Sequence, residues 1–146
     1  MLAGILLVAA SGKMADVVFS GSKRTKTIQG LARLRTNIQQ LYGTESSYST
    51  LTTQRIINAG GIPSEFVVVG SNVKNPFGGN TVIAKSGSDL FYIQIQNIPQ
   101  GECQKILTAS LNGIWNKVAI TNTGNVVTTG VKPVCRDKET MFFFSE

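Results

Sequence analysis

Two cysteines are the residues of this chain best suited to chemistry, and their spacing limits what that chemistry can be. Cys103 and Cys135 lie 32 positions apart, and neither belongs to a C-x-x-C or other closely spaced metal-binding pattern. Two alternatives remain: a disulfide, or two separate thiols buried in a core. A disulfide would stabilise the fold by roughly 3 to 4 kcal/mol through loop-closure entropy. It would also indicate an oxidising compartment such as the periplasm or the cell surface.

The remaining side chains offer little for catalysis. The sequence contains no histidine, so the commonest general base and the commonest transition-metal ligand are both missing. The eight acidic residues are scattered, whereas a glycosidase needs two carboxylates that face each other. Four of them are expected to be solvated surface charges: Glu45, Glu65, Asp89 and Glu102. We therefore predict no enzymatic activity and no cofactor or metal site.

The formal net charge of +6 is concentrated near the N-terminus. Residues 1–35 hold six basic residues and one acid, which leaves 14 − 6 = 8 basic and 8 − 1 = 7 acidic residues for the rest of the chain. Three of the six form a basic cluster, Lys23, Arg24 and Lys26, which either solubilises this stretch or meets membrane phosphates or acidic neighbours. This distribution weakens an interpretation as a nucleic-acid binder. A secreted small basic module that binds nucleic acid or a surface ligand is kept as the alternative function.

The N-terminal segment is apolar but short. The run from Leu2 to Ala10 is continuously apolar apart from Gly4. A transmembrane helix needs about 20 such residues, so this run alone cannot cross a bilayer. We expect residues 1–24 to be part of a hydrophobic stem or a vector-derived segment, and residues 25–146 to form one head domain.

The clearest periodic pattern predicts a helix that ends near Gly43. Five apolar residues follow three-four spacing on one helical face, and this face is expected to pack on a sheet: Ile28, Leu31, Leu34, Ile38 and Leu41. The sequence before Ile28 permits a longer helix, although Gly21 and Ser22 would weaken it.

The rest of the chain alternates short helices with strands. The expected elements are a short helix around residues 56–57, a strand at 66–69, strands at 81–85 and 90–96, a helix at 102–112, a hairpin of 115–121 with 126–129, and a last strand at 141–144 packed on both faces. The helix at 102–112 places Cys103 on a turn that faces the core. The predicted fold class is α+β, with a long N-terminal helix packed on an antiparallel sheet.

Three sequence pieces recur in this order in a known family. They are Leu41 to Leu51 with its two tyrosines, Ile57-Asn58-Ala59-Gly60-Gly61-Ile62-Pro63, and Lys74-Asn75-Pro76-Phe77-Gly78-Gly79. Together with the strand at 90–96, the helix opening at Cys103 and the late Cys135, they resemble type IVb pilins, particularly those of conjugative thin pili and bundle-forming pili. The resemblance covers about residues 25 to 136.

The resemblance implies a structural subunit of a type IVb pilus. In such a fibre the front half of the N-terminal helix bundles with its neighbours and the back half packs on the sheet. Cys103 and Cys135 would bound the family's disulfide region. A processed pilin carries a glutamate close to its start, whereas the first glutamate here is Glu45, so the front is expected to be truncated or modified.

The resemblance also implies partners and a location. The partners would be identical subunits in a helical fibre, the assembly machinery of a Gram-negative inner membrane, and a recipient-cell or host surface. The expected location is the extracellular fibre, preceded by the inner membrane and periplasm. The expected roles are conjugation or DNA transfer, adhesion and aggregation.

Overall fold

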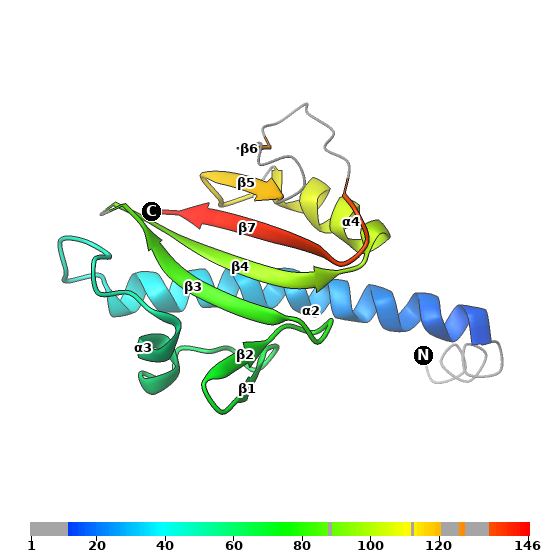
Figure 1. Cartoon of the computed structure of the whole chain (residues 1–146), viewed down its shortest axis with the longest axis horizontal. Coiled ribbons are helices and arrows are strands. Elements are labelled where there is room, and N and C mark those ends of the chain that lie inside the picture. Colours follow the sequence, from blue (N-terminus) through cyan, green and yellow to red (C-terminus); the bar gives the residue numbers. More distant parts are fainter. Residues whose placement is uncertain (1–11, 88, 112, 121–125, 128–134) are drawn as a thin grey trace.

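The fold contains a long helix that lies along a sheet (Figure 1). The computed structural model describes residues 12–87, 89–111, 113–120, 126–127 and 135–146, and side-chain burial from residue 21 onward. The helix α2 spans Gly12–Leu41, so its 30 residues are roughly 45 Å long at 1.5 Å each. It therefore begins well before the apolar pattern does. Figure 1 shows α2 lying along the sheet and projecting beyond it at its N-terminal end.

The face of α2 that meets the core differs from the predicted face at one residue. Leu31, Leu34 and Ile38 are fully buried, and Ile28 packs partly against the core. Leu41, in contrast, is 40% exposed, and the next residue, Tyr42, is buried in its place. At 3.6 residues per turn, Tyr42 lies about three whole turns after Leu31, whereas Leu41 falls roughly 80° short of that face. The prediction for Leu41 was therefore wrong.

Seven strands of the described residues form one antiparallel sheet in the order β1-β2-β3-β4-β7-β5-β6. Their bounds are β1 Val67–Val69, β2 Asn72–Lys74, β3 Asn80–Ser86, β4 Leu90–Ile98, β5 Lys117–Ile120, β6 Val126–Val127 and β7 Glu139–Ser145. Together with α2, this sheet confirms the predicted α+β fold.

The central strands alternate between a buried and a half-buried face. Along β4, Phe91, Ile93 and Ile95 are fully buried, while the residues between them are half-exposed. The same alternation runs along β7, where Phe143 is buried and Phe142 is half-exposed. The prediction that the last strand packs on both faces was wrong, because α2 covers only one face of an antiparallel sheet (Figure 1).

The chain places its last strand in the middle of the sheet. After β4 the helix α4, Gln100–Leu111, leads to β5, and β7 later fills the position between β4 and β5. The last strand was predicted at 141–144, but β7 begins two residues earlier, at the buried Glu139. The turn predicted for residues 122–125 lies outside the described residues.

The connector between α2 and β3 holds more structure than predicted. The short helix α3, Thr53–Asn58, begins after Thr52, whose hydroxyl accepts a hydrogen bond from the Arg55 amide at 3.1 Å. The strand β1 was predicted, but its partner β2 was not. β2 is only three residues long and leads directly into a Pro-Gly turn, so its sequence is dominated by turn signals.

Candidate functional site

The disulfide predicted as one of two alternatives is present. Cys103 and Cys135 are joined, with their Cα atoms 6.1 Å apart, and both residues are almost completely buried. α4 positions Cys103 in its first turn, where the Cys103 amide donates to the carbonyl of Pro99 at 2.8 Å. The Cys135 amide donates to Oε1 of Gln104 at 2.8 Å. The bridge and this hydrogen bond tie the segment before β7 to the start of α4.

The residue next to Cys103 is not the solvated charge that was predicted. Glu102 is buried, and its Oε1 accepts a hydrogen bond from Nη1 of Arg24 at 2.7 Å. Glu65 was also expected to be solvated, but only 9% of its side chain is exposed. Its Oε2 lies 3.1 Å from Nη1 of Arg33, and its buried Oε1 has no hydrogen-bond partner among the described residues. Both carboxylates therefore join α2 to other parts of the head.

The predicted basic cluster is divided by this arrangement. Arg24 points to Glu102, whereas Lys23 and Lys26 are exposed. These two lysines line a groove of about 720 Å³ together with Glu65, Val67 and the half-buried Lys74, which we call the basic groove. Arginine is the side chain best suited to bidentate phosphate recognition. Because Arg24 pairs with Glu102, the positive charges that line the basic groove are those of lysines.

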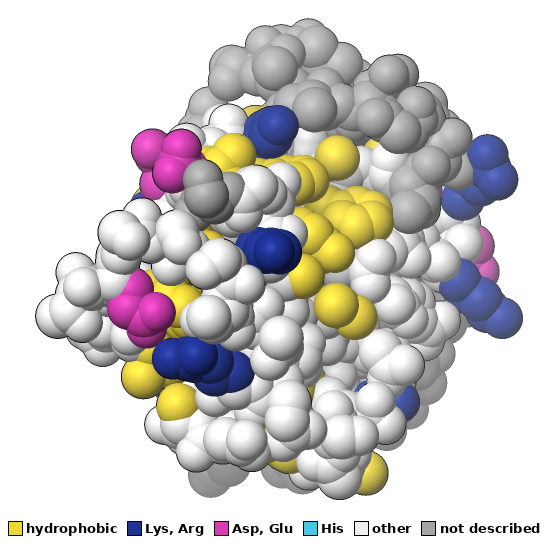
Figure 2. All heavy atoms as spheres, turned by 60° about the vertical axis from the view of Figure 1, so that its left-hand side comes forward, with side chains coloured by type: hydrophobic (Ala, Val, Ile, Leu, Met, Phe, Trp, Pro, Cys, Tyr) yellow, Lys and Arg dark blue, Asp and Glu magenta, His cyan; other side chains and the backbone are white. Residues whose placement is uncertain are grey.

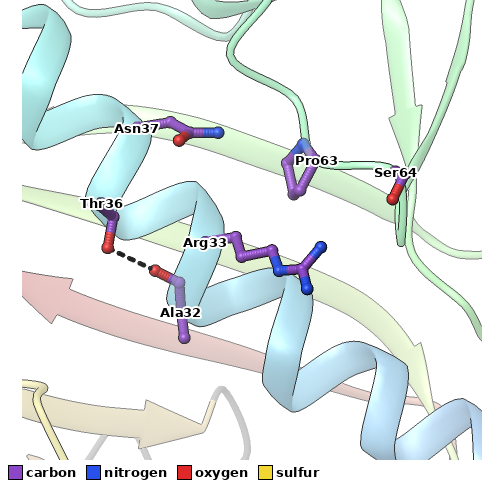
Figure 3. A pocket seen from close by; sticks show the side chains of 6 residues that line it. All are labelled: Ala32, Arg33, Thr36, Asn37, Pro63 and Ser64. Atoms are coloured by element: carbon purple, nitrogen blue, oxygen red, sulfur yellow. Dashed lines mark hydrogen bonds between the residues drawn. The ribbon is translucent and has the colours of Figure 1, made fainter.

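A second hollow lies between α2 and the segment that follows α3. Figure 3 shows Arg33 reaching from α2 below Pro63, with Asn37 one turn further along the helix. The Asn37 side chain donates to the carbonyl of Gly61 at 2.9 Å, and Arg33 pairs with Glu65. These contacts fasten the connector to α2. The hollow therefore lies at the contact between α2 and the connector. Arg33 is the one ionisable group among the described residues that line it.

The end of the head farthest from the projecting part of α2 carries an acidic cleft of about 330 Å³. Its acidic lining residues are Glu45, Asp89 and Glu146, and its aromatic lining residues are Tyr42 and Tyr48. Burial raises the pKa of Tyr48, a shift that a nearby arginine opposes and Glu146 adds to. Glu45 lies 3.4 Å from Nη2 of an exposed arginine of α3. The cleft is thus a mixed surface of carboxylates and tyrosine rings.

The sheet face opposite α2 carries an aromatic cluster. The Tyr92 ring lies 5.7 Å from the rings of both Phe142 and Phe144, and the Lys117 ammonium lies 5.0 Å from the Phe144 centroid. Figure 2 shows hydrophobic side chains gathered on this side of the molecule with basic side chains among them. The sequence reasoning missed this surface. The signal for it is the run Met141 to Phe144, because in a strand successive side chains point to opposite faces of the sheet.

Two kinds of feature are absent from the part of the chain that the structure describes: clusters of metal ligands and membrane-spanning helices. Within the described residues, no three side chains among His, Cys, Asp and Glu are placed to hold a metal ion. The helices in the described ranges include none that is long and apolar enough to span a membrane.

The resemblance pieces build turns that hold the head together. The buried Asn75 accepts a hydrogen bond from the Phe77 amide and donates one to the carbonyl of Gln96, both at 2.8 Å. A Cβ at Gly79 would overlap the backbone of Gln96, so this position requires glycine. The turn between β2 and β3 is therefore locked against the end of β4.

The comparisons with known proteins agree with this architecture. The family model described as "PilS N terminal" matches residues 22–145, which is most of the chain. Among solved structures, the fold is similar to TcpA, a type IV pilin from Vibrio cholerae El Tor biotype, with a TM-score of 0.61 and 13% sequence identity. The match covers 86% of this chain and 99% of TcpA. No curated protein sequence matches significantly.

The family model and the fold both point to a subunit of a fibre. Pilins are structural subunits that assemble with copies of themselves into an extracellular pilus. The chain therefore belongs to the PilS family and is a type IV pilin, a subunit of a type IV pilus.

Proposed function

We propose that the chain is the major subunit of a type IVb pilus that acts between cells, in conjugation or DNA transfer, adhesion or aggregation. The observation that carries the proposal is the similarity of the fold to TcpA, which covers 86% of this chain, together with the sequence pieces that resemble type IVb pilins. The front part of α2 projects beyond the sheet (Figure 1), in the position from which a stem would enter a fibre core.

The head has the properties that an exposed fibre subunit needs. A disulfide that closes a loop of 32 positions stabilises the folded subunit, and it persists in an oxidising compartment. The aromatic cluster around Tyr92 gives the subunit an apolar surface that other copies or a cell surface can cover. A contact between two different patches of identical copies does not close on itself, so it continues into a helical filament.

Complementation of a pilin-deletion strain tests this function. The full chain with a hydrophobic stem is expressed in the deletion strain, and filaments, mating frequency, adhesion and aggregation are measured. We expect filaments and recovery of at least one contact-dependent activity. The matched control is Cys103→Ala/Cys135→Ala, which is expected to yield fewer filaments. Filaments that restore none of the three activities would contradict the proposed role, and so would a complete lack of filaments from well-expressed parent chain.

A further inference from the structure

The two ends of the head carry complementary surfaces. The basic groove lies where α2 projects from the sheet, and its lysines are Lys23, Lys26 and Lys74. The acidic cleft lies at the opposite end, where α2 stops and β7 ends (Figure 1). From Lys26 to Leu41 the helix rises by about 22 Å, so the two surfaces are well separated within one molecule.

The charges of the basic groove are available to a partner. Among the described residues that line the groove, the carboxylate is Glu65, which is already paired with Arg33, so these residues carry an excess of positive charge. Lys74 donates to the Asn80 side chain at 2.7 Å and keeps its charge. Lys23 and Lys26 are exposed, and within the described residues neither forms an ion pair.

The acidic cleft offers the opposite charge. Three carboxylates line it, and one of them, Glu45, lies 3.4 Å from Nη2 of Arg55. Arg35 donates from Nε to the Ser145 hydroxyl at 2.9 Å and is not among the residues that line the cleft, although its charge acts on Tyr48. Figure 2 looks at this end of the molecule and shows separate acidic side chains at its surface.

Each surface also presents apolar groups beside its charges. Val67, 58% exposed, lines the basic groove and begins the edge strand β1, whose three valines are all exposed. At the acidic cleft the apolar group is the half-buried Tyr48, which lies beside the buried Tyr42. Edge strands with exposed apolar side chains readily contact another chain. Charge pairs surrounded by such groups set the register and the partner choice of an interface.

We propose that the acidic cleft of one copy docks on the basic groove of the next copy along the fibre. The contact is heterologous, because it joins two different patches, and it repeats without closing. The inference rests on the chain forming a fibre and is independent of what the fibre does between cells.

Zero-length cross-linking of intact fibres tests the contact directly. A carbodiimide joins a lysine amine to a carboxylate only where the two touch. We expect peptides that link Lys23, Lys26 or Lys74 to Glu45, Asp89 or Glu146, and the separation within one molecule makes such links intermolecular. Fibres that cross-link without any of these pairs would overturn the proposal. Fibres that cross-link as expected but support no mating, adhesion or aggregation would contradict only the proposed function.

Charge reversal supplies a second test, in which reversing the charges on both surfaces together should restore the assembly that reversal on either surface alone reduces. Lys23→Glu/Lys26→Glu and Glu45→Lys/Asp89→Lys should each lower the yield of sheared fibres about tenfold, because like charges then meet. The combined fourfold variant should recover to within about threefold of the parent chain. A matched control, Lys105→Glu/Lys138→Glu, makes the same charge change on exposed residues outside the groove and should assemble like the parent.

The rescue separates this proposal from its competitors. If the fourfold variant assembles no better than Lys23→Glu/Lys26→Glu, the groove does not meet the acidic cleft, and contact with membrane phosphates or nucleic acid becomes the better explanation. The amount of unassembled subunit in the cell is measured for every variant. A variant that is degraded is replaced by the neutral pair Lys23→Gln/Lys26→Gln, for which a loss of about threefold is expected and a parent-like yield would overturn the proposal.

Discussion

Arg24 and Glu102 are 78 positions apart in the sequence, and their side chains meet at 2.7 Å between α2 and α4. Only 11% of the Glu102 side chain and 28% of the Arg24 side chain are exposed. Because Glu102 precedes Cys103, the ion pair and the disulfide lie side by side in the first turn of α4. The N-terminal helix is thereby attached to the disulfide-bounded segment.

Removal of Arg24 should destabilise the head more than removal of both partners. Arg24→Ala leaves a nearly buried carboxylate unpaired, which costs about 1 to 3 kcal/mol. In Arg24→Ala/Glu102→Gln no such charge is left, so the loss should be smaller than the sum of the two single losses. Denaturant unfolding of the four proteins in this cycle measures the coupling. Additive losses would show that the pair contributes nothing.

A matched exposed pair is the control for that experiment. Arg55 and Glu45 are 49% and 37% exposed and lie 3.4 Å apart. Exposed ion pairs contribute about 0 to 1 kcal/mol. Arg55→Ala should therefore change the free energy of unfolding by less than Arg24→Ala does.

Two glycines of α2 should respond to alanine with opposite signs. Gly30 lies under Phe66, and a Cβ there would come within 2.5 Å of the Phe66 ring. The helix gains about 1 kcal/mol from alanine, but overpacking costs about 1 to 3 kcal/mol, so Gly30→Ala should be net destabilising. Gly21 has more room, with its closest atom at 3.6 Å, so Gly21→Ala should raise the free energy of unfolding. A stabilised Gly30→Ala would show that Phe66 moves aside freely.

Loss of the disulfide should lower stability without changing the fold. Cys103→Ala/Cys135→Ala removes a cross-link of 32 positions, for which loop-closure entropy gives roughly 3 to 4 kcal/mol. The thermal midpoint of the variant should fall accordingly. Intact mass after thiol alkylation should show two modified cysteines in the parent chain only after reduction. Equal midpoints for variant and parent would contradict the stabilising role.

Alkaline pH should destabilise the parent chain through Tyr48. Burial raises the pKa of this phenol above its ordinary value of 10.0. Above about pH 10 the unfolded chain therefore loses this proton before the folded chain does, so stability falls as the pH rises. Tyr48→Phe keeps the ring that packs 5.0 Å from the Phe91 ring and removes the proton. The difference in stability between parent and Tyr48→Phe should shrink or reverse above pH 10; a constant difference would contradict this.

Local signals in the sequence were sufficient for most of the fold. The spacing of Leu31, Leu34 and Ile38 predicts the buried face of α2, and the alternation around Ile93 predicts β4. Thr52 and Gly60 mark the ends of α3 because capping and positive φ depend on a few neighbouring residues. The disulfide followed from cysteine count and resemblance.

Long-range arrangement was not predictable in the same way. Glu102 and Glu65 were expected to be solvated surface charges. Each of them instead pairs with an arginine that is distant in sequence, Arg24 or Arg33. The position of β7 between β4 and β5 and the groove at Lys74 likewise depend on tertiary packing. No local pattern records which distant segments meet.

Electron cryomicroscopy of fibres assembled from the full chain tests the central claim most directly. The account predicts a helical fibre in which α2 continues toward the core, the sheet faces outward, and each acidic cleft lies against the basic groove of a neighbouring copy. A fibre in which α2 lies on the outside, or in which the acidic cleft does not meet the basic groove of another copy, would contradict it.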